Sequence, residues 1–464
     1  DAGRRRDAFD AYFAAASVLA AAAVDARLAA LRDEMEPLAE EDGQRAMLAV
    51  LQQLLLVENR LHDEAWRVTL QGILQAQRAG LPEIEAELCW AQAIMHWLRR
   101  EVTDALRMVE QALVLLAPID PVHRRLHLHG TEFKLNHALG VFLGAAGRYE
   151  QSNTRFLQAL HQAEQSNNQR QCIDVERALA RNALDQGQLS QALRWGTAAL
   201  SRSEGLALAS RYETPVVELQ AGVLATAGQL GGALALYERV ERLSEPGMWS
   251  NLVHPLVRRA VFLHQLGRRD LAVKSLRALH ADHKLLEMER ALVDAALLAV
   301  GEPADAGAVL EQVGGINDFQ LRVLMLCLAR RGCEPAALLP LLGVSLATAR
   351  ECGAHGLWLS LQVQRVAALR VAGRVDEAAA AALVAWQRME EGLSGRDLLP
   401  ELAAELCAAL VVSHADLAAV IALRASAWMQ AAASTLPAGW RSNYLQRAPA
   451  LTLLQRPMLP APGD

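Results

Sequence analysis

The chain has 464 residues and a formal net charge of −6, with 52% apolar but only 5% aromatic residues. This length exceeds a usual single core, which indicates several domains or one extended array. The acidic balance lacks the basic footprint of nucleic-acid binding proteins, so a nucleic-acid partner is not favoured. Alanine and leucine supply most apolar residues and alternating β-branched runs are scarce, so the fold is predicted to be all-α.

The sequence indicates neither a membrane span nor an oxidising compartment. The uncharged stretch from Ala11 to Val24 is mostly alanine and is shorter than the roughly 20 strongly apolar residues that a membrane helix needs. The six cysteines lie far apart and form no C-x-x-C pair. We therefore expect a reduced, cytoplasmic protein without a membrane partner.

The ends of the chain differ from its middle. Residues 1–43 are predicted to form one or two alanine-rich helices that cap the array or link it to another module. Residues 44–410 hold a repeat array, and residues 411–435 a capping helix that shields the last apolar face. Residues 436–464 contain five prolines, which break helices, so we expect a Pro-rich mobile tail there.

A short pattern recurs through the array: a glycine, then a small residue five places later. The glycine ends one helix because it reaches the left-handed conformation without steric cost, and the small residue lets the next helix cross closely. The clearest pairs are Gly147–Ser152, Gly187–Ala192, Gly228–Ala233, Gly267–Ala272 and Gly373–Ala378; Gly301–Ala306 and Gly332–Ala337 are looser, and Arg60–Ala65 and Arg100–Ala105 lack the glycine. Each unit is therefore a helical hairpin that needs its neighbours to complete a core.

The unit around Gly147 carries further small and aromatic positions. Gly140 precedes Gly147 by seven residues, and Tyr149, Phe156 and Ala159 follow it by two, nine and twelve. This order resembles the tetratricopeptide repeat, although the period is near 40 residues rather than 34. The resemblance implies a right-handed α-α superhelix of about nine hairpins that binds a protein or peptide partner.

The long period, the segment from Ala349 to Arg374 and the tail from Leu436 to Pro449 support a second resemblance. They resemble the superhelical domains of bacterial signal-transduction ATPase regulators of the maltose-activator type. This implies a bacterial sensor or scaffold, the C-terminal part of a larger regulator, with an ATPase or output module outside this chain. A free-standing adaptor or a peptide-pheromone receptor with the same architecture is the alternative.

The first helix of each hairpin lines the concave groove in repeats of this type, and offsets from the glycines place candidate ligand-binding residues there. These residues are Lys134, His137, Arg177, Arg181, Glu218, His254 and His264, with Trp90 and Trp97 as groove or core residues. Arg177 and Arg181 are four residues apart and share one helix face. With Lys134 and His137 they predict a cationic pocket for a carboxylate or an acidic peptide, unless Asp174 and Asp185 neutralise them.

No phosphate-binding loop, dinucleotide fingerprint or protease signature occurs, so we expect no catalytic residues and no cofactor. His123, His127 and His129, followed by His137, lack cysteine partners, so no metal is predicted. An enzyme with an unrecognised site near residues 123–137 is the alternative from another class. The segment from Leu342 to Arg350 resembles the start of a DNA-recognition helix, but no basic cluster surrounds it.

Overall fold

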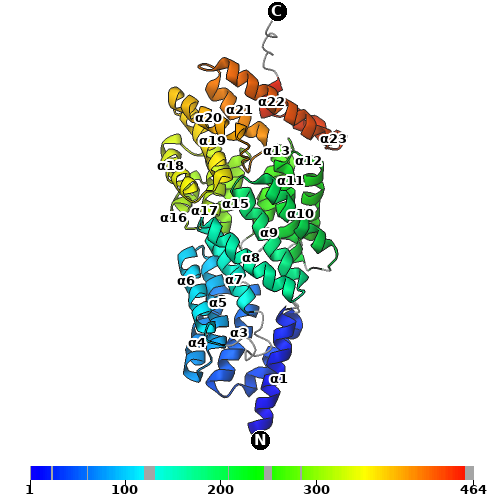
Figure 1. Ribbon diagram of the computed structural model, residues 1–464, viewed down its shortest axis with the longest axis vertical. Helices are drawn as coiled ribbons and strands as arrows, with labels where there is room; N and C mark the ends of the chain where they lie inside the picture. The colour runs from blue at the N-terminus through cyan, green and yellow to red at the C-terminus, as the bar shows by residue number, and fades with distance from the viewer. Residues whose placement is uncertain are drawn as a thin grey trace, which may run out of the picture. The chain divides into compact units, whose positions relative to one another are not determined.

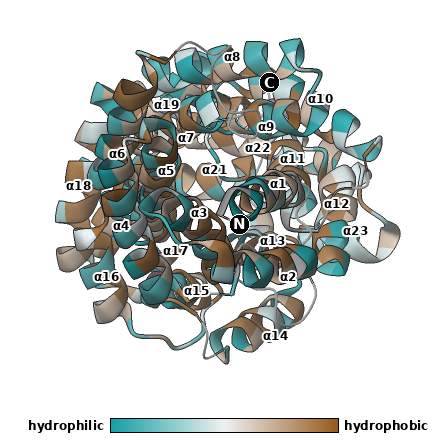
Figure 2. Cartoon of the chain, turned by 90° about the horizontal axis from the view of Figure 1, so that it is seen from below, coloured by the Kyte–Doolittle hydropathy of each residue, from teal (hydrophilic) through white to brown (hydrophobic). Residues whose placement is uncertain are grey.

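The structure is a computed structural model that describes residues 2–21, 25–59, 61–119, 131–206, 208, 210–244, 253–282 and 285–454. Every regular element in these ranges is helical, which confirms the all-α solenoid prediction. Most helices carry both hydrophilic and hydrophobic residues (Figure 2), as expected for elements that bury one side against neighbours. The chain divides into two compact units, residues 1–167 and residues 168–464.

Unit 1 consists of two leading helices and three hairpins. Its helices are α1 (Ala2–Ala21), α2 (Asp25–Met35), α3 (Asp42–Glu58), α4 (His62–Ala79), α5 (Pro82–Leu98), α6 (Val102–Leu116), α7 (Thr131–Ala145) and α8 (Tyr149–Gln165). Phe9 and Phe13 of α1 are fully buried in one core cluster with Leu48 and Leu51 of α3. The leading helices therefore cover the apolar side of the first hairpin.

Unit 2 continues the hairpins and adds a closing segment. Its helices are α9 (Gln169–Asp185), α10 (Leu189–Glu204), α11 (Ser210–Thr226), α12 (Leu230–Leu243), α13 (Val253–Gln265), α14 (Arg269–His280), α15 (Glu287–Ala299), α16 (Ala306–Gly315), α17 (Phe319–Ala329), α18 (Pro335–Glu351), α19 (His355–Val371), α20 (Val375–Glu390), α21 (Leu399–Leu410), α22 (Ala415–Ser434), α23 (Ala438–Gln446) and α24 (Ala448–Leu454).

The glycine and the small residue five places later have the predicted geometry at the five clear positions. Their glycines adopt φ values between 73° and 83°, and the small residues five places later are fully buried. In the unit around Gly147, the Ser152 hydroxyl donates a hydrogen bond to the Gly140 carbonyl, 2.6 Å away. A Cβ on Gly140 would lie 2.6 Å from the Phe156 ring, so this position requires glycine. Arg100 adopts a left-handed φ of 62° without being a glycine.

The looser match at Gly332 is wrong. Gly332 ends a short 3-10 turn, and the next residue, Cys333, is extended with φ −105° and ψ 143°. Pro335 then begins α18, where its fixed φ and missing N–H suit the first helical turn. The connection is therefore extended rather than a left-handed turn, and Ala337 is exposed.

The closing segment of unit 2 returns to much earlier hairpins (Figure 1), where α23 lies near α12 and α13. The Gly231 amide donates a hydrogen bond to the Thr435 hydroxyl, 3.0 Å away. The guanidinium of Arg268 lies 5.3 Å from the centre of the Trp440 ring. These contacts hold the end of unit 2 against the turns that begin α12 and α14.

The tail expected from residue 436 onward contains two helices up to residue 454, in contrast to the sequence prediction. Tyr444 is fully buried, Leu453 is almost so, and Arg447 forms an ion pair with Glu401. Pro437 and Pro449 do not break these helices because they lie at helix starts, where a proline costs no hydrogen bond. Residues 455–464 of the expected tail lie outside the described residues.

Among the described residues, α22 alone has the length and apolar composition of a membrane-spanning helix, with a mean hydropathy of 1.2. Ile421 and Met429 of this helix are fully buried within the protein. A core helix of a soluble protein passes the same test, so composition here does not distinguish the two roles.

Candidate functional site

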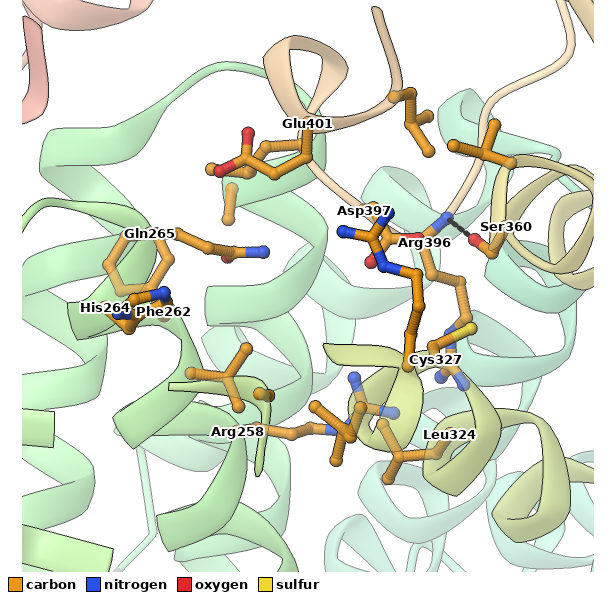
Figure 3. A pocket seen from close by; sticks show the side chains of 18 of the residues that line it. Arg258, Phe262, His264, Gln265, Leu324, Cys327, Ser360, Arg396, Asp397 and Glu401 are labelled. Carbon is orange, nitrogen blue, oxygen red and sulfur yellow. Dashed lines mark hydrogen bonds between the residues drawn. The ribbon is translucent and has the colours of Figure 1, made fainter. Parts of the chain in front are cut away.

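Unit 2 contains a cavity of about 270 Å³ between the first helices of its hairpins. Its walls come from α11, α13, α17, α19 and α21, from the 3-10 turn after α17 and the α20–α21 connection, and from residues 447–449. Tyr237 of α12 and Ala299 of α15 complete them. In the view of Figure 3, Glu401 lies across the cavity from Arg258, and His264 lies opposite Arg396. The first helices of the hairpins, which we expected to line an open groove, therefore line this cavity instead.

Buried charges form one wall of the cavity. Glu218 of α11 lies 3.4 Å from both Arg181 of α9 and Arg258 of α13. Arg396 of the α20–α21 connection lies 3.2 Å from Asp185, the last residue of α9. Burial lowers the pKa of Arg258 to about 10, and the neighbouring Arg396 cation is the next cause. The guanidinium groups of Arg258 and Arg396 are therefore close enough to repel one another.

Cations also surround the opposite wall. The Arg331 guanidinium donates a hydrogen bond to Nε2 of His264 over 3.2 Å. Burial, together with the cations of Arg331, Arg447 and Arg269, lowers the pKa of His264 to about 4. His264 is therefore neutral at pH 7 and acts as an acceptor. Arg447 pairs with Glu401, which itself lines the cavity.

A buried carboxyl group and a thiol lie beside Arg396. Burial raises the pKa of the Asp397 carboxyl, while Ser360 and nearby arginines oppose this shift. Burial likewise raises the pKa of the Cys327 thiol well above its usual range, which makes it a weak nucleophile. The Ser360 hydroxyl accepts a hydrogen bond from the Arg396 amide, 3.1 Å away (Figure 3). This arrangement suits binding through charge and shape, and no nucleophile–base pair is formed by these described residues.

Four of the predicted ligand-binding residues meet near the cavity. Arg181 and Glu218 form the ion pair behind it, Arg177 is close enough to lower the pKa of Arg181, and His264 lines the cavity. Burial is the main cause of that shift. His254 of α13 is half-buried and does not line the cavity. Asp185, which the sequence offered as a counter-charge for Arg177 and Arg181, instead forms its ion pair with Arg396, and Arg181 pairs with Glu218.

The other predicted residues belong to unit 1 and have partners there. Lys134 lies 3.1 Å from the buried Glu87 carboxylate and over the Trp90 ring. The His137 ring lies 5.8 Å from the Phe133 ring and equally far from the Phe156 ring. Trp97 packs against Phe142 with ring centres 5.3 Å apart. Both tryptophans are partly buried against a core cluster, which was the alternative to a groove position.

Several cavity residues were missed by the sequence analysis. Arg258 is four residues after the predicted His254 on the same helix. A wider set of offsets from the repeat glycines would therefore have included Arg258. Arg396 and Asp397 lie in a connection between hairpins, where no repeat offset applies. Arg447 lies in the segment expected to be a mobile tail. No sequence signal marks them, because Arg258 is followed by Arg259 and Arg396 by Asp397, as at any charged surface segment.

One group in the described residues brings three potential metal-ligand atoms within 4.8 Å of each other: His96, Glu101 and Asp104 of unit 1. Nδ1 of His96 lies 2.6 Å from Glu101, and Asp104 pairs with Arg107 at 2.8 Å. Both carboxylates are partly exposed and already have partners, so we assign no metal here. His123, His127 and His129 lie outside the described residues.

No protein-family model and no curated protein matches this chain. The solved structures that share its fold include NprR in complex with its cognate peptide NprX, and Rap protein complexed with Competence and Sporulation Factor. The NprR chain is 13% identical, with 74% of this chain and 99% of that chain covered and a TM-score of 0.55. The Rap chain is 13% identical, with 80% and 99% covered and a TM-score of 0.57. They show a TPR-like helical repeat fold and do not support the maltose-activator resemblance.

Proposed function

We propose that this chain is a peptide-binding helical repeat protein whose ligand places one anchoring side chain in the unit 2 cavity. The observation that carries the proposal is the cavity of about 270 Å³, lined by the first helices of successive hairpins and by buried charges. Its volume is just below the range for ligand pockets, roughly 300–1,000 Å³, and suits one side chain better than a whole peptide. The shared fold with the NprR–peptide complex supports this ligand class.

The biological role that we propose for this binding rests on the sequence. We infer a non-enzymatic sensor or scaffold that passes ligand binding to an output module, as part of a bacterial, cytoplasmic signal-transduction regulator. A free-standing adaptor or peptide receptor would use the same cavity. An attached ATPase would favour the first version, and binding without any attached module would favour the second.

Selection from a randomised linear peptide library tests the proposal. The wild type is compared with Leu324→Trp, which fills the cavity, and with the matched Val371→Trp, where an exposed valine on α19 is replaced instead. We expect enriched peptides to bind the wild type and Val371→Trp, and to lose binding to Leu324→Trp. Circular dichroism confirms folding, and Gln265→Trp provides a second cavity-filling variant. Equal binding to all folded variants would refute the cavity as the site.

A further inference from the structure

Guanidinium groups outnumber their carboxylate partners along the buried wall of the cavity, and burial raises the pKa of the further carboxyl group there, Asp397, which disfavours its charged form. Three guanidinium groups, of Arg181, Arg258 and Arg396, are paired there with two carboxylates, of Glu218 and Asp185. Both carboxylate side chains are at most 3% exposed, so solvent screens this imbalance weakly. Burying a cation without a counter-charge is costly, which makes this wall a favourable place for an added anion.

The opposite wall shows the same excess. His264 is kept neutral by burial and by three surrounding arginines, so it adds no positive charge itself. Its lowered pKa indicates that its surroundings are positively charged. Arg330 pairs with Glu405 at 2.6 Å, and Arg447 pairs with Glu401, so these cavity-lining carboxylates are already engaged. An incoming anion would therefore meet arginines whose charge is only partly compensated.

We propose that the unit 2 cavity binds a carboxylate of the peptide ligand, held between the guanidinium groups of Arg258 and Arg396. This inference rests on the proposed function and specifies its ligand. Arginine binds a carboxylate through two parallel hydrogen bonds, which gives direction as well as affinity. Glu218 and Asp185 hold the two guanidinium groups in place from behind.

The size of the cavity and of its charge excess favours a carboxylate over a phosphate. Because Glu401, Glu405 and Asp397 also line the cavity, the excess of positive charge is small and is matched by one negative charge rather than two. The small volume likewise suits the planar end of an acidic side chain or a peptide C-terminus. The sequence predicted an acidic peptide partner, and the proposal places its carboxylate in this cavity. The cationic pocket predicted from the sequence differed, because it grouped Arg177 and Arg181 with Lys134 and His137 of unit 1.

The test uses labelled hexapeptide pools and the full-length protein, with affinity measured by fluorescence anisotropy. One pool carries a glutamate at a random position and an amidated C-terminus, a second carries glutamine instead, and a third has no acidic side chain but a free C-terminus. We expect the wild type to bind the glutamate pool or the free-terminus pool at least about tenfold more tightly than the glutamine pool. The preferred pool identifies the source of the carboxylate.

Two variants and one control locate the preference. Arg396→Lys keeps the charge but loses the planar fork, and Arg258→Gln removes a cation while Glu218 keeps its ion pair with Arg181. Both are expected to reduce the preference, with Arg258→Gln abolishing it. The control is Arg388→Gln, because Arg388 is exposed on α20 and pairs with Glu391 of the same turn. If one of the two variants does not fold, the other decides.

The outcomes separate the two proposals. If the pools bind equally but Leu324→Trp blocks them, the carboxylate inference is wrong and the peptide-binding cavity stands. If no pool distinguishes the wild type from Leu324→Trp, both proposals fail. If inorganic phosphate displaces the glutamate pool more effectively than acetate does, the assignment to a carboxylate is wrong. An unchanged preference in Arg258→Gln would also overturn it.

Discussion

The C-terminal segment of unit 2 packs against the start of α12, beside Gly231. This packing predicts that alanine substitutions at Gly231 and at the neighbouring Gly232 have opposite effects on stability. A Cβ on Gly231 would lie 2.1 Å from the Thr435 carbonyl oxygen, which is backbone and cannot rotate away. A Cβ on Gly232 would lie 3.3 Å from the end of the flexible Leu224 side chain. Gly232→Ala should therefore gain up to about 1 kcal/mol from helix propensity. Gly231→Ala should lose about 1–3 kcal/mol through overpacking.

The expected difference between the two variants is thus about 1–4 kcal/mol. Urea unfolding measures it, and hydrogen exchange of the amides in α22 and α23 locates it, because loss of docking exposes those helices first. Gly231→Ala should also exchange faster in these two helices while α9 and α10 stay protected. Equal stability of the two variants, or unchanged exchange in α22 and α23, would refute this packing.

Three further substitutions test the packing and the charge environment of single residues. Gly140→Ala should destabilise unit 1 by about 1–3 kcal/mol in urea unfolding, because its Cβ meets the buried Phe156 ring. Lys134→Met should cost about 1–2 kcal/mol by the same assay, because it removes one partner of the buried Glu87 carboxylate. The His264 pKa is about 4 in the folded protein and 6.5 in the unfolded chain, so this residue's contribution is complete above pH 6.5 and is lost as the pH falls towards 4. Urea unfolding across this range should show a loss of at most about 3 kcal/mol that His264→Gln removes.

Two of these substitutions have a matched control variant, and the third has an outcome that would contradict it. Gly314→Ala adds a Cβ with no atom within 4 Å, so it should not destabilise as Gly140→Ala does. Lys274→Met removes an exposed lysine and should leave stability nearly unchanged. If His264→Gln retains the full pH dependence of the wild type, His264 is not its source.

The hairpin fold follows from local sequence, and this is why it could be predicted. Gly187 and Ala192 act within one turn: a left-handed residue ends a helix, and a small residue permits the crossing. Arg100 shows that a residue other than glycine can adopt the same turn. Gly332 shows the reverse, since Pro335 two residues beyond Cys333 selects an extended connection instead.

The site was predictable only in part, because it depends on which hairpins meet. Glu218 and His264 were found from repeat offsets, but Arg396 comes from a connection and Arg447 from the closing segment. Their approach depends on contacts between residues more than 200 apart, such as Gly231 with Thr435. Such contacts leave no periodic signal in one sequence. The pairing of Lys134 with Glu87, 47 residues away, was missed for the same reason.

Photo-crosslinking from inside the cavity tests the central claim most directly. A diazirine analogue of leucine, similar in size to leucine itself, replaces Leu324, which lines the cavity, or Val371, which is 75% exposed on α19. The glutamate-containing peptide pool is added and crosslinked products are identified by mass spectrometry. Peptide binding in the cavity predicts adducts at position 324 that excess unlabelled pool suppresses, and none at position 371. Equal adducts at both positions, or adducts at position 371 alone, would contradict it.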